Sequence, residues 1–231
     1  MTDLTFAMPD VNVSGKEDSE FPISPLCMTV PYGETMVVFI GTLDRQVYRR
    51  NLHTNSANQP DMRGTRKQKD IFSGHDGPVS CLSSNINFVR PNCSTNGLML
   101  SGSFDWGIKM WNAKACQENL FDFEFHKDYV TDVQWNPVHP GCFISTDVDG
   151  TTAVWNMFHD REKPSVAHKN TAGNLKARWN FNGRHFAIGD MKGDISVNKL
   201  RASDIEYDEE NLVEFVNLMT DLSHGRGNFF F

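Results

Sequence analysis

The sequence lacks long apolar runs. The longest, Met36 to Ile40, has five residues, whereas a helix that spans a bilayer needs about 20. The first residues, MTDLTFAMPDV, contain no basic stretch followed by an apolar run, so we expect no secretory signal peptide. The sequence therefore favours a soluble intracellular protein without membrane insertion.

The sequence also lacks the cysteine and charge patterns of disulfide, metal or nucleic-acid proteins. Its five cysteines, at positions 27, 81, 93, 116 and 142, stand singly, and no two have a two-residue separation. This spacing argues against a disulfide framework, a zinc site or a redox pair. The formal net charge is -7, and a nucleic-acid surface normally needs a basic face. We expect no metal, no cofactor and no nucleic-acid partner.

Motifs of enzymes are missing as well. The sequence contains no glycine-rich phosphate loop, no metal-ligand spacing and no activated-nucleophile motif. His139 and Cys142 lie close together in VHPGC, and we interpret them as turn and strand residues. The alternative, a reactive Cys–His pair, would require an unusually low thiol pKa. The sequence predicts that the protein is not an enzyme.

What the sequence does contain is a repeat. LMLSGSFDWGIKMW (98–111) and FISTDVDGTTAVW (143–155) each place an aspartate six residues before a tryptophan. Trp111 and Trp155 are 44 residues apart, within the period of about 40–45 residues that is typical of WD-repeat blades. Short β-branched or aromatic segments between Gly, Asn, Asp and Pro turns indicate strands throughout. The pattern predicts an all-β fold, a WD-repeat β-propeller.

The starts of the blades repeat in phase with their ends. A histidine lies four residues before the first valine of a strand in two places, His75 before Val79 and His126 before Val130. In blades of this kind a buried hydrogen-bond network joins a turn aspartate, this histidine, a strand hydroxyl and the indole N–H. The predicted members are His75, Ser101, Asp105 and Trp111 in one blade, and His126, Ser145, Asp149 and Trp155 in the next. A catalytic Ser–His–Asp set is the alternative; we disfavour it because each member already has a structural position and the set occurs twice.

About four blades can be recognised, so the predicted propeller is incomplete. We expect an N-terminal arm over residues 1–24, the partial propeller over 25–203, and a C-terminal helix and tail over 204–231. The first and fourth blades have Arg50 and Asn198 where tryptophan would stand. The polar segment 51–70 is interpreted as a loop that joins the first blade to the second. It carries a basic cluster of Arg63, Arg66, Lys67 and Lys69.

The C-terminal segment from Asp208 to Leu222 has helical periodicity. Its apolar residues fall on one face, and they are Leu212, Phe215, Val216, Met219 and Leu222. Asp208 suits the N-terminal cap and Gly225 suits the end of the helix. The sequence leaves two alternatives open, a helix that packs on the propeller and a helix that binds a partner.

Three motifs resemble a known family. GHDGPV (74–79), SFDWGIKMW (103–111) and DYVTDVQWNPVHP (128–140) are similar to blade motifs in the WD-repeat half of the cytoplasmic dynein intermediate chain. The Phe-Asp-Trp of the blade turn is much more specific than the general WD signature. The resemblance covers roughly residues 25–200, and its most specific part is 104–140.

The resemblance implies a non-catalytic subunit of a microtubule motor, located in the cytoplasm on the cytoskeleton. In that family the propeller binds the dynein heavy chain, and a disordered N-terminal half binds dynein light chains and dynactin. The arm before Pro25 is too short to supply that half, so we expect those partners only through the complex. The family propeller also has more blades, and we therefore expect a truncated or strongly reduced homologue.

Two other functions remain open from the sequence. One is an axonemal or ciliary dynein intermediate chain, and the other is an unrelated WD-repeat scaffold, such as a ubiquitin-ligase adaptor or a chromatin-associated module. Trp106 is the first candidate for a partner contact, because packing does not require an indole at a hairpin tip. Phe104 and Tyr129 are the next candidates. The alternative is that Trp106 packs against the neighbouring blade.

Overall fold

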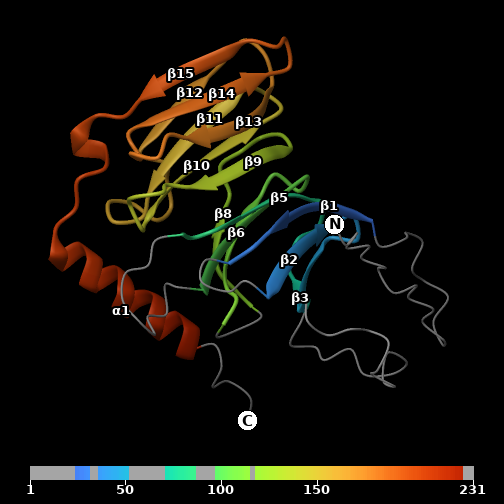
Figure 1. Ribbon diagram of the computed structural model, residues 1–231, viewed down its shortest axis with the longest axis vertical. Coiled ribbons are helices and arrows are strands. Elements are labelled where there is room, and N and C mark those ends of the chain that lie inside the picture. Colours follow the sequence, from blue (N-terminus) through green and yellow to red (C-terminus); the bar gives the residue numbers. More distant parts are fainter. Residues whose placement is uncertain (1–23, 32–35, 52–70, 87–96, 115–117, 226–231) are drawn as a thin grey trace, which may run out of the picture.

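The computed structural model describes residues 24–31, 36–51, 71–86, 97–114 and 118–225. Within these ranges the chain forms four antiparallel sheets that follow one another in sequence order, and one long helix (Figure 1). The N-terminal arm up to residue 23, the basic cluster of residues 63–69 and the tail from residue 226 lie outside the described residues.

Each sheet is one propeller blade. Blade 1 contains β1 (Pro25–Thr29), β2 (Val37–Thr42), β3 (Gln46–Asn51) and β4 (Ile71–Ser73). Blade 2 contains β5 (Val79–Ser84), β6 (Leu98–Ser103), β7 (Ile108–Asn112) and β8 (Asn119–Phe123). Blade 3 contains β9 (Val130–Trp135), β10 (Cys142–Asp147), β11 (Thr151–Asn156) and β12 (Val166–Lys169).

Blade 4 and the C-terminal elements complete the described chain. Blade 4 has three strands in the described ranges: β13 (Asn174–Trp179), β14 (His185–Asp190) and β15 (Ile195–Lys199). A short 3-10 turn, η3 (Ala202–Asp204), and the helix α1 (Glu209–Gly225) follow. The predicted fold class, an open WD-type propeller of four blades with a C-terminal helix, is confirmed.

One expected connection is wrong. The segment 51–70 does not join blade 1 to blade 2, because β4 follows it and pairs with β3 in the sheet of blade 1. The physical reason is Phe72, a buried side chain whose ring meets Phe39 at 5.7 Å and Trp111 at 5.9 Å. A strand of three residues is too short to show alternation in the sequence.

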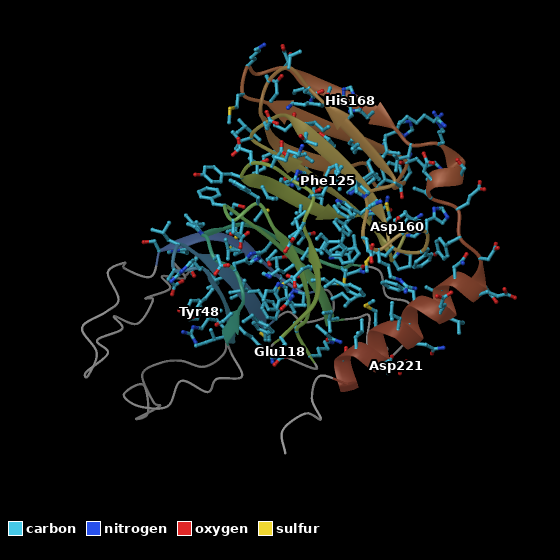
Figure 2. All side chains as sticks on the ribbon, turned by 180° about the vertical axis from the view of Figure 1, so that it is seen from behind. Tyr48, Glu118, Phe125, Asp160, His168 and Asp221 are labelled. Carbon is cyan, nitrogen blue, oxygen red and sulfur yellow. The ribbon has the colours of Figure 1, made fainter. Side chains whose placement is uncertain are left out.

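The hydrophobic core lies between the blades. One cluster joins blades 1 and 2 around Trp111, a second joins blades 2 and 3 around Trp155, and a third joins blades 3 and 4 around Phe186. The ring of Phe125, in the middle of the molecule in Figure 2, packs on Trp155 at 5.9 Å. Phe125 is partly buried, whereas each fully buried large apolar side chain of these clusters stabilises the fold by about 1.5–3 kcal/mol.

The first strands of blades 2 and 3 each pass close to a glycine of the blade before them. A Cβ on Gly41 would lie 2.7 Å from Cγ1 of Val79, and one on Gly102 would lie 2.6 Å from Cγ1 of Val130. Gly189 has the corresponding position in blade 4. It pairs with Ile195, the first residue of the third strand, just as Gly102 in blade 2 pairs with Ile108. A Cβ on Gly189 would meet nothing within 4 Å. The glycine contact is therefore filled in blades 1 and 2 and open in blade 4.

Both ends of the arc expose apolar side chains. On β15, Ile195 is 75% and Val197 is 71% exposed, and Met28 on β1 is exposed at the other end. Exposed apolar patches of this kind usually mark surfaces that another element covers. The described blades thus form an open arc whose two flanks have the character of blade interfaces.

The helix α1 returns to blades 2 and 3. Phe215 and Met219 are buried in the cluster between these blades, which explains the apolar face of the helix. Ser223 accepts a hydrogen bond from Asn112 Nδ2 at 2.9 Å, and Asp204 O accepts one from Asn156 Nδ2 at 3.0 Å. Both asparagines lie directly after a blade tryptophan, so the C-terminal segment covers the strand ends opposite the β6–β7 and β10–β11 hairpins.

We expect Gly102→Ala to lower the free energy of unfolding by about 2 kcal/mol, because the new methyl group overlaps Val130 and Cys81. Gly189→Ala is the matched control. It should be neutral or stabilising by about 0.5 kcal/mol, since alanine restricts the unfolded chain more than glycine does. Urea denaturation of both variants checks this, and equal losses would contradict the close contact between blades 2 and 3.

Candidate functional site

The hairpins between the second and third strands of the blades share one geometry. In each blade the second strand carries a glycine or threonine that pairs across this hairpin with the third strand. The residue four positions later has a positive φ, and these residues are Arg45 (70°), Trp106 (70°), Gly150 (86°) and Gly193 (88°). Three-residue hairpin loops commonly place such a left-handed residue last. Blades 3 and 4 use glycine there, whereas blade 2 holds a tryptophan in a conformation that side chains rarely adopt.

In blade 2 a chain of hydrogen bonds links this hairpin to the core. Trp111 Nε1 donates to Ser101 Oγ at 2.8 Å, and that oxygen lies 2.7 Å from His75 Nε2. His75 Nδ1 lies 2.8 Å from Asp105 Oδ2. With a neutral imidazole, the three bonds are compatible if the serine hydroxyl donates to Nε2 and Nδ1–H donates to the carboxylate. The structure thus brings together the four residues that the sequence places in this network.

Asp105 holds the hairpin through both of its carboxylate oxygens. Partial burial acts to raise its pKa, but hydrogen bonds from His75 and from the amides of Asp76 and Gly107 outweigh this and lower the pKa to about 2. The carboxylate is therefore ionised at neutral pH. Because the folded pKa is lowered, its contribution to stability is present above pH 3.8 and is lost as the pH falls toward 2.

Blade 3 builds the same network with a different aspartate, so the expectation for Asp149 is wrong. Trp155 Nε1 donates to Ser145 Oγ at 3.0 Å, and that oxygen lies 2.7 Å from His126 Nε2. His126 Nδ1 contacts Asp147 Oδ2 at 2.8 Å, whereas Asp149 lies on the surface and pairs with Lys169 at 2.6 Å.

The choice of aspartate has a physical reason. Asp147 is two residues after Ser145 on the same strand, so both side chains point to the same face of the sheet. Its other oxygen accepts the amide of Thr151 at 2.7 Å. In blade 2 the corresponding residue is Ser103, which donates to Gly77 O, and Asp105 therefore reaches back from the loop. The alternation of side chains along β10 was the sequence signal that could have identified Asp147.

These networks are structural. Ser101 and Ser145 are fully buried, and each hydroxyl oxygen also accepts an indole N–H. A serine in this position has no free path to a substrate. The same holds for Cys142, whose thiol is buried and whose pKa is raised by desolvation, opposite to the shift that a reactive thiolate requires.

His139 is a core residue. Its ring lies between Phe158 at 4.7 Å and Tyr207 at 4.6 Å, and its Nδ1 accepts the amide of Gly141 at 3.1 Å. Burial lowers its pKa to about 4 from the ordinary 6.5. Its Nε2 is buried and has no hydrogen-bond partner within the described part of the chain.

Three exposed aromatic residues stand at the hairpin end of blade 2. Trp106 is 51% exposed, and Phe104 and Tyr129 are 39% and 46% exposed. Phe104 and Tyr129 stack with ring centroids 4.7 Å apart, which joins the hairpin of blade 2 to the loop that enters blade 3. Trp106 is half exposed, so the neighbouring blade does not cover the indole completely.

Asp132 is a residue that the sequence did not single out. It is buried on β9, accepts the amide of Ala177 at 3.1 Å and contacts Arg178 Nη1 at 3.0 Å, and so links blades 3 and 4. In blade 1, where the tryptophan is absent, Tyr48 donates to Asp44 at 2.6 Å instead.

Among the described ranges no group of three or more His, Cys, Asp or Glu side chains is arranged to hold a metal ion. None of the helices in these ranges has the length and apolar character needed to cross a membrane.

We expect Asp147→Asn to lower the free energy of unfolding by about 2 kcal/mol, because either His126 or the Thr151 amide loses its buried acceptor. Asp149→Asn should change it by less than about 0.5 kcal/mol. Guanidinium denaturation distinguishes the two variants, and a larger loss for Asp149→Asn would restore the original expectation.

We expect the stability of the fold to depend on pH through His139. Because the folded pKa of His139 is about 4 and its ordinary value is 6.5, only the unfolded chain binds this proton between the two. The free energy of unfolding should therefore decrease as the pH is lowered below 6.5. This residue contributes at most about 1.4 kcal/mol per pH unit to that decrease. In His139→Gln the free energy of unfolding, measured by denaturation between pH 7 and 5, should decrease less steeply as the pH is lowered. An unchanged slope would mean that the ring is not desolvated.

Comparison with known proteins agrees with this geometry. The family model "WD domain, G-beta repeat" matches residues 66–112 and 117–156, and each matched segment contains all the residues of one complete network. The chain is 32% identical over 173 residues to the cytoplasmic dynein 1 intermediate chain of Drosophila melanogaster, covering 74% of this chain and 24% of that protein. It is 28% identical over 144 residues to the dynein axonemal intermediate chain 2 of Xenopus laevis, covering 61% of this chain and 23% of that protein.

The chain thus spans about a quarter of the length of the curated relatives that it matches. The residues that the family model matches include the hairpins and buried networks of blades 2 and 3 described above. The chain therefore carries WD40 repeats and is a homologue of the dynein intermediate chains over this part of their length.

Proposed function

We propose that the chain is a non-catalytic, intermediate-chain-like subunit of a cytoplasmic dynein motor complex that binds the dynein heavy chain in microtubule-based transport. The observation that carries the proposal is the 32% identity over 173 residues to a cytoplasmic dynein intermediate chain. It would act in the cytoplasm on the microtubule cytoskeleton.

The chemistry of the described residues supports a binding role. The Ser–His–Asp sets are buried beneath the indoles that they support, and the Cys142 thiol is buried with a raised pKa. A propeller of this kind offers loops and rims to partners, and function on such a fold must be argued from a surface. Light chains and dynactin would associate with the complex, not with the described residues of this chain.

We place the heavy-chain contact on the hairpin end of blades 2 and 3, at Phe104, Trp106 and Tyr129. The opposite strand ends of these blades are covered by α1. Trp106 also holds a positive φ that glycine holds in blades 3 and 4. An exposed aromatic residue kept in a strained conformation is typical of a functional contact.

An axonemal dynein assignment is the second candidate, and the 28% identity to an axonemal intermediate chain favours it. An unrelated scaffold role, in a ubiquitin ligase or on chromatin, is the third. Affinity capture of the tagged chain from its source cell separates them. Cytoplasmic heavy chain supports the proposal, and axonemal heavy chain supports the second candidate. A ligase or histones captured without any dynein heavy chain would overturn the dynein assignment.

We expect Trp106→Gly to abolish most heavy-chain binding without loss of stability. Glycine relieves the positive φ, so the free energy of unfolding should stay equal or rise by up to about 1 kcal/mol. The loss of an aromatic anchor should weaken binding by at least about thirtyfold. The control is Phe181→Ala, since Phe181 is 87% exposed on blade 4, away from this surface. Equal binding by wild type and Trp106→Gly in a pull-down would reject the contact.

A further inference from the structure

The hairpin end of blade 2 combines aromatic rings with carboxylates. We name the surface formed by Asp76, Phe104, Trp106, Asp128 and Tyr129 the tip patch. Its segments touch one another: Phe104 N–H donates to Pro78 O at 3.0 Å, and Asp76 N–H donates to Asp105 at 2.9 Å. The patch is therefore one continuous surface built from three loops.

The charge of this surface is one-sided. The segments 74–79, 103–107 and 126–130 contain three aspartates and one lysine, Lys127. Asp105 is committed to His75, but Asp76 is exposed and Asp128 is half exposed, with one oxygen bound to the Tyr129 amide. Two carboxylates thus lie in the same loops as the stacked rings of Phe104 and Tyr129, and neither takes part in the buried hydrogen-bond network of blade 2.

This combination is chemically specific. The face of an aromatic ring attracts a cation, and a guanidinium can stack on it while its N–H groups reach a carboxylate. A carboxylate-bearing or purely apolar partner would leave Asp76 and Asp128 without a complement. Trp106, two residues further along the hairpin, supplies an apolar surface for the rest of the bound segment.

We propose that the tip patch binds a protein segment that presents arginine or lysine beside apolar side chains, with the cation between the aromatic rings and the Asp76 and Asp128 carboxylates. The identity of the partner as a dynein heavy chain rests on the proposed function. The cationic character of the bound segment rests on the patch alone. Binding is therefore electrostatically steered and weakens as salt rises.

The test uses the full chain and a fluorescent 12-residue peptide that alternates arginine with leucine, together with its glutamate–leucine counterpart. Fluorescence polarisation at low and high salt should show binding of the arginine peptide only, weakened by salt. Asp76→Asn with Asp128→Asn should weaken binding by about fivefold to tenfold. The control is the double variant Glu206→Gln with Asp221→Asn. Both residues are exposed and lie outside the patch, and Asp221 is on α1 (Figure 2). The control carries the same charge change and should bind as the wild type does.

The inference is overturned if the glutamate peptide binds as tightly as the arginine peptide, or if both double variants bind alike. A parallel measurement with the heavy-chain tail keeps the two proposals separate. If the tail binds wild type and the Asp76/Asp128 variant equally, the cationic inference fails and the proposed function stands. If the tail does not bind wild type while the arginine peptide behaves as expected, the proposed function fails and the inference stands.

Discussion

The buried run of hydrogen bonds from indole to serine to histidine to aspartate is the constraint on which the blades depend. Its polar atoms lie in the core, so each must find its partner within the chain. In blade 2 the run begins at Trp111 and ends at Asp105, whose second oxygen holds the Gly107 amide. The core tryptophan thereby fixes the hairpin that carries Phe104 and Trp106. Surface geometry at the tip is set from inside the blade.

Much of this could be predicted from the sequence, because the landmarks are local. The tryptophan and histidine periods identify the blades, and the spacing from His75 to Trp111 identifies one complete network. The same spacing misassigns blade 3, since it counts positions and does not say which of two nearby aspartates faces the histidine. Asp147 is the last residue of β10 and faces the histidine, whereas Asp149 lies in the turn after the strand. Which aspartate is used therefore depends on where β10 ends.

The remaining features depend on contacts between blades, which no local pattern describes. Gly41, Gly102 and Gly189 look alike in sequence, yet the first two are covered by a valine of the next blade and the third faces open space. Likewise, the periodicity of α1 predicts an apolar face but leaves its partner open. The structure resolves this through Phe215 and Met219, which pack between blades 2 and 3.

The hairpin positions with positive φ show where stability and recognition separate. Blades 3 and 4 have Gly150 and Gly193, the residues that this conformation favours, whereas blade 2 has Trp106. None of the buried network bonds uses the Trp106 side chain, so the network itself does not require an indole at this place. Trp106 is half exposed in a conformation that favours glycine, which is why we place the proposed partner contact there. The Phe-Asp-Trp turn thus divides into Asp105, which the buried network uses, and two exposed aromatic residues, on which we place the proposed partner contact.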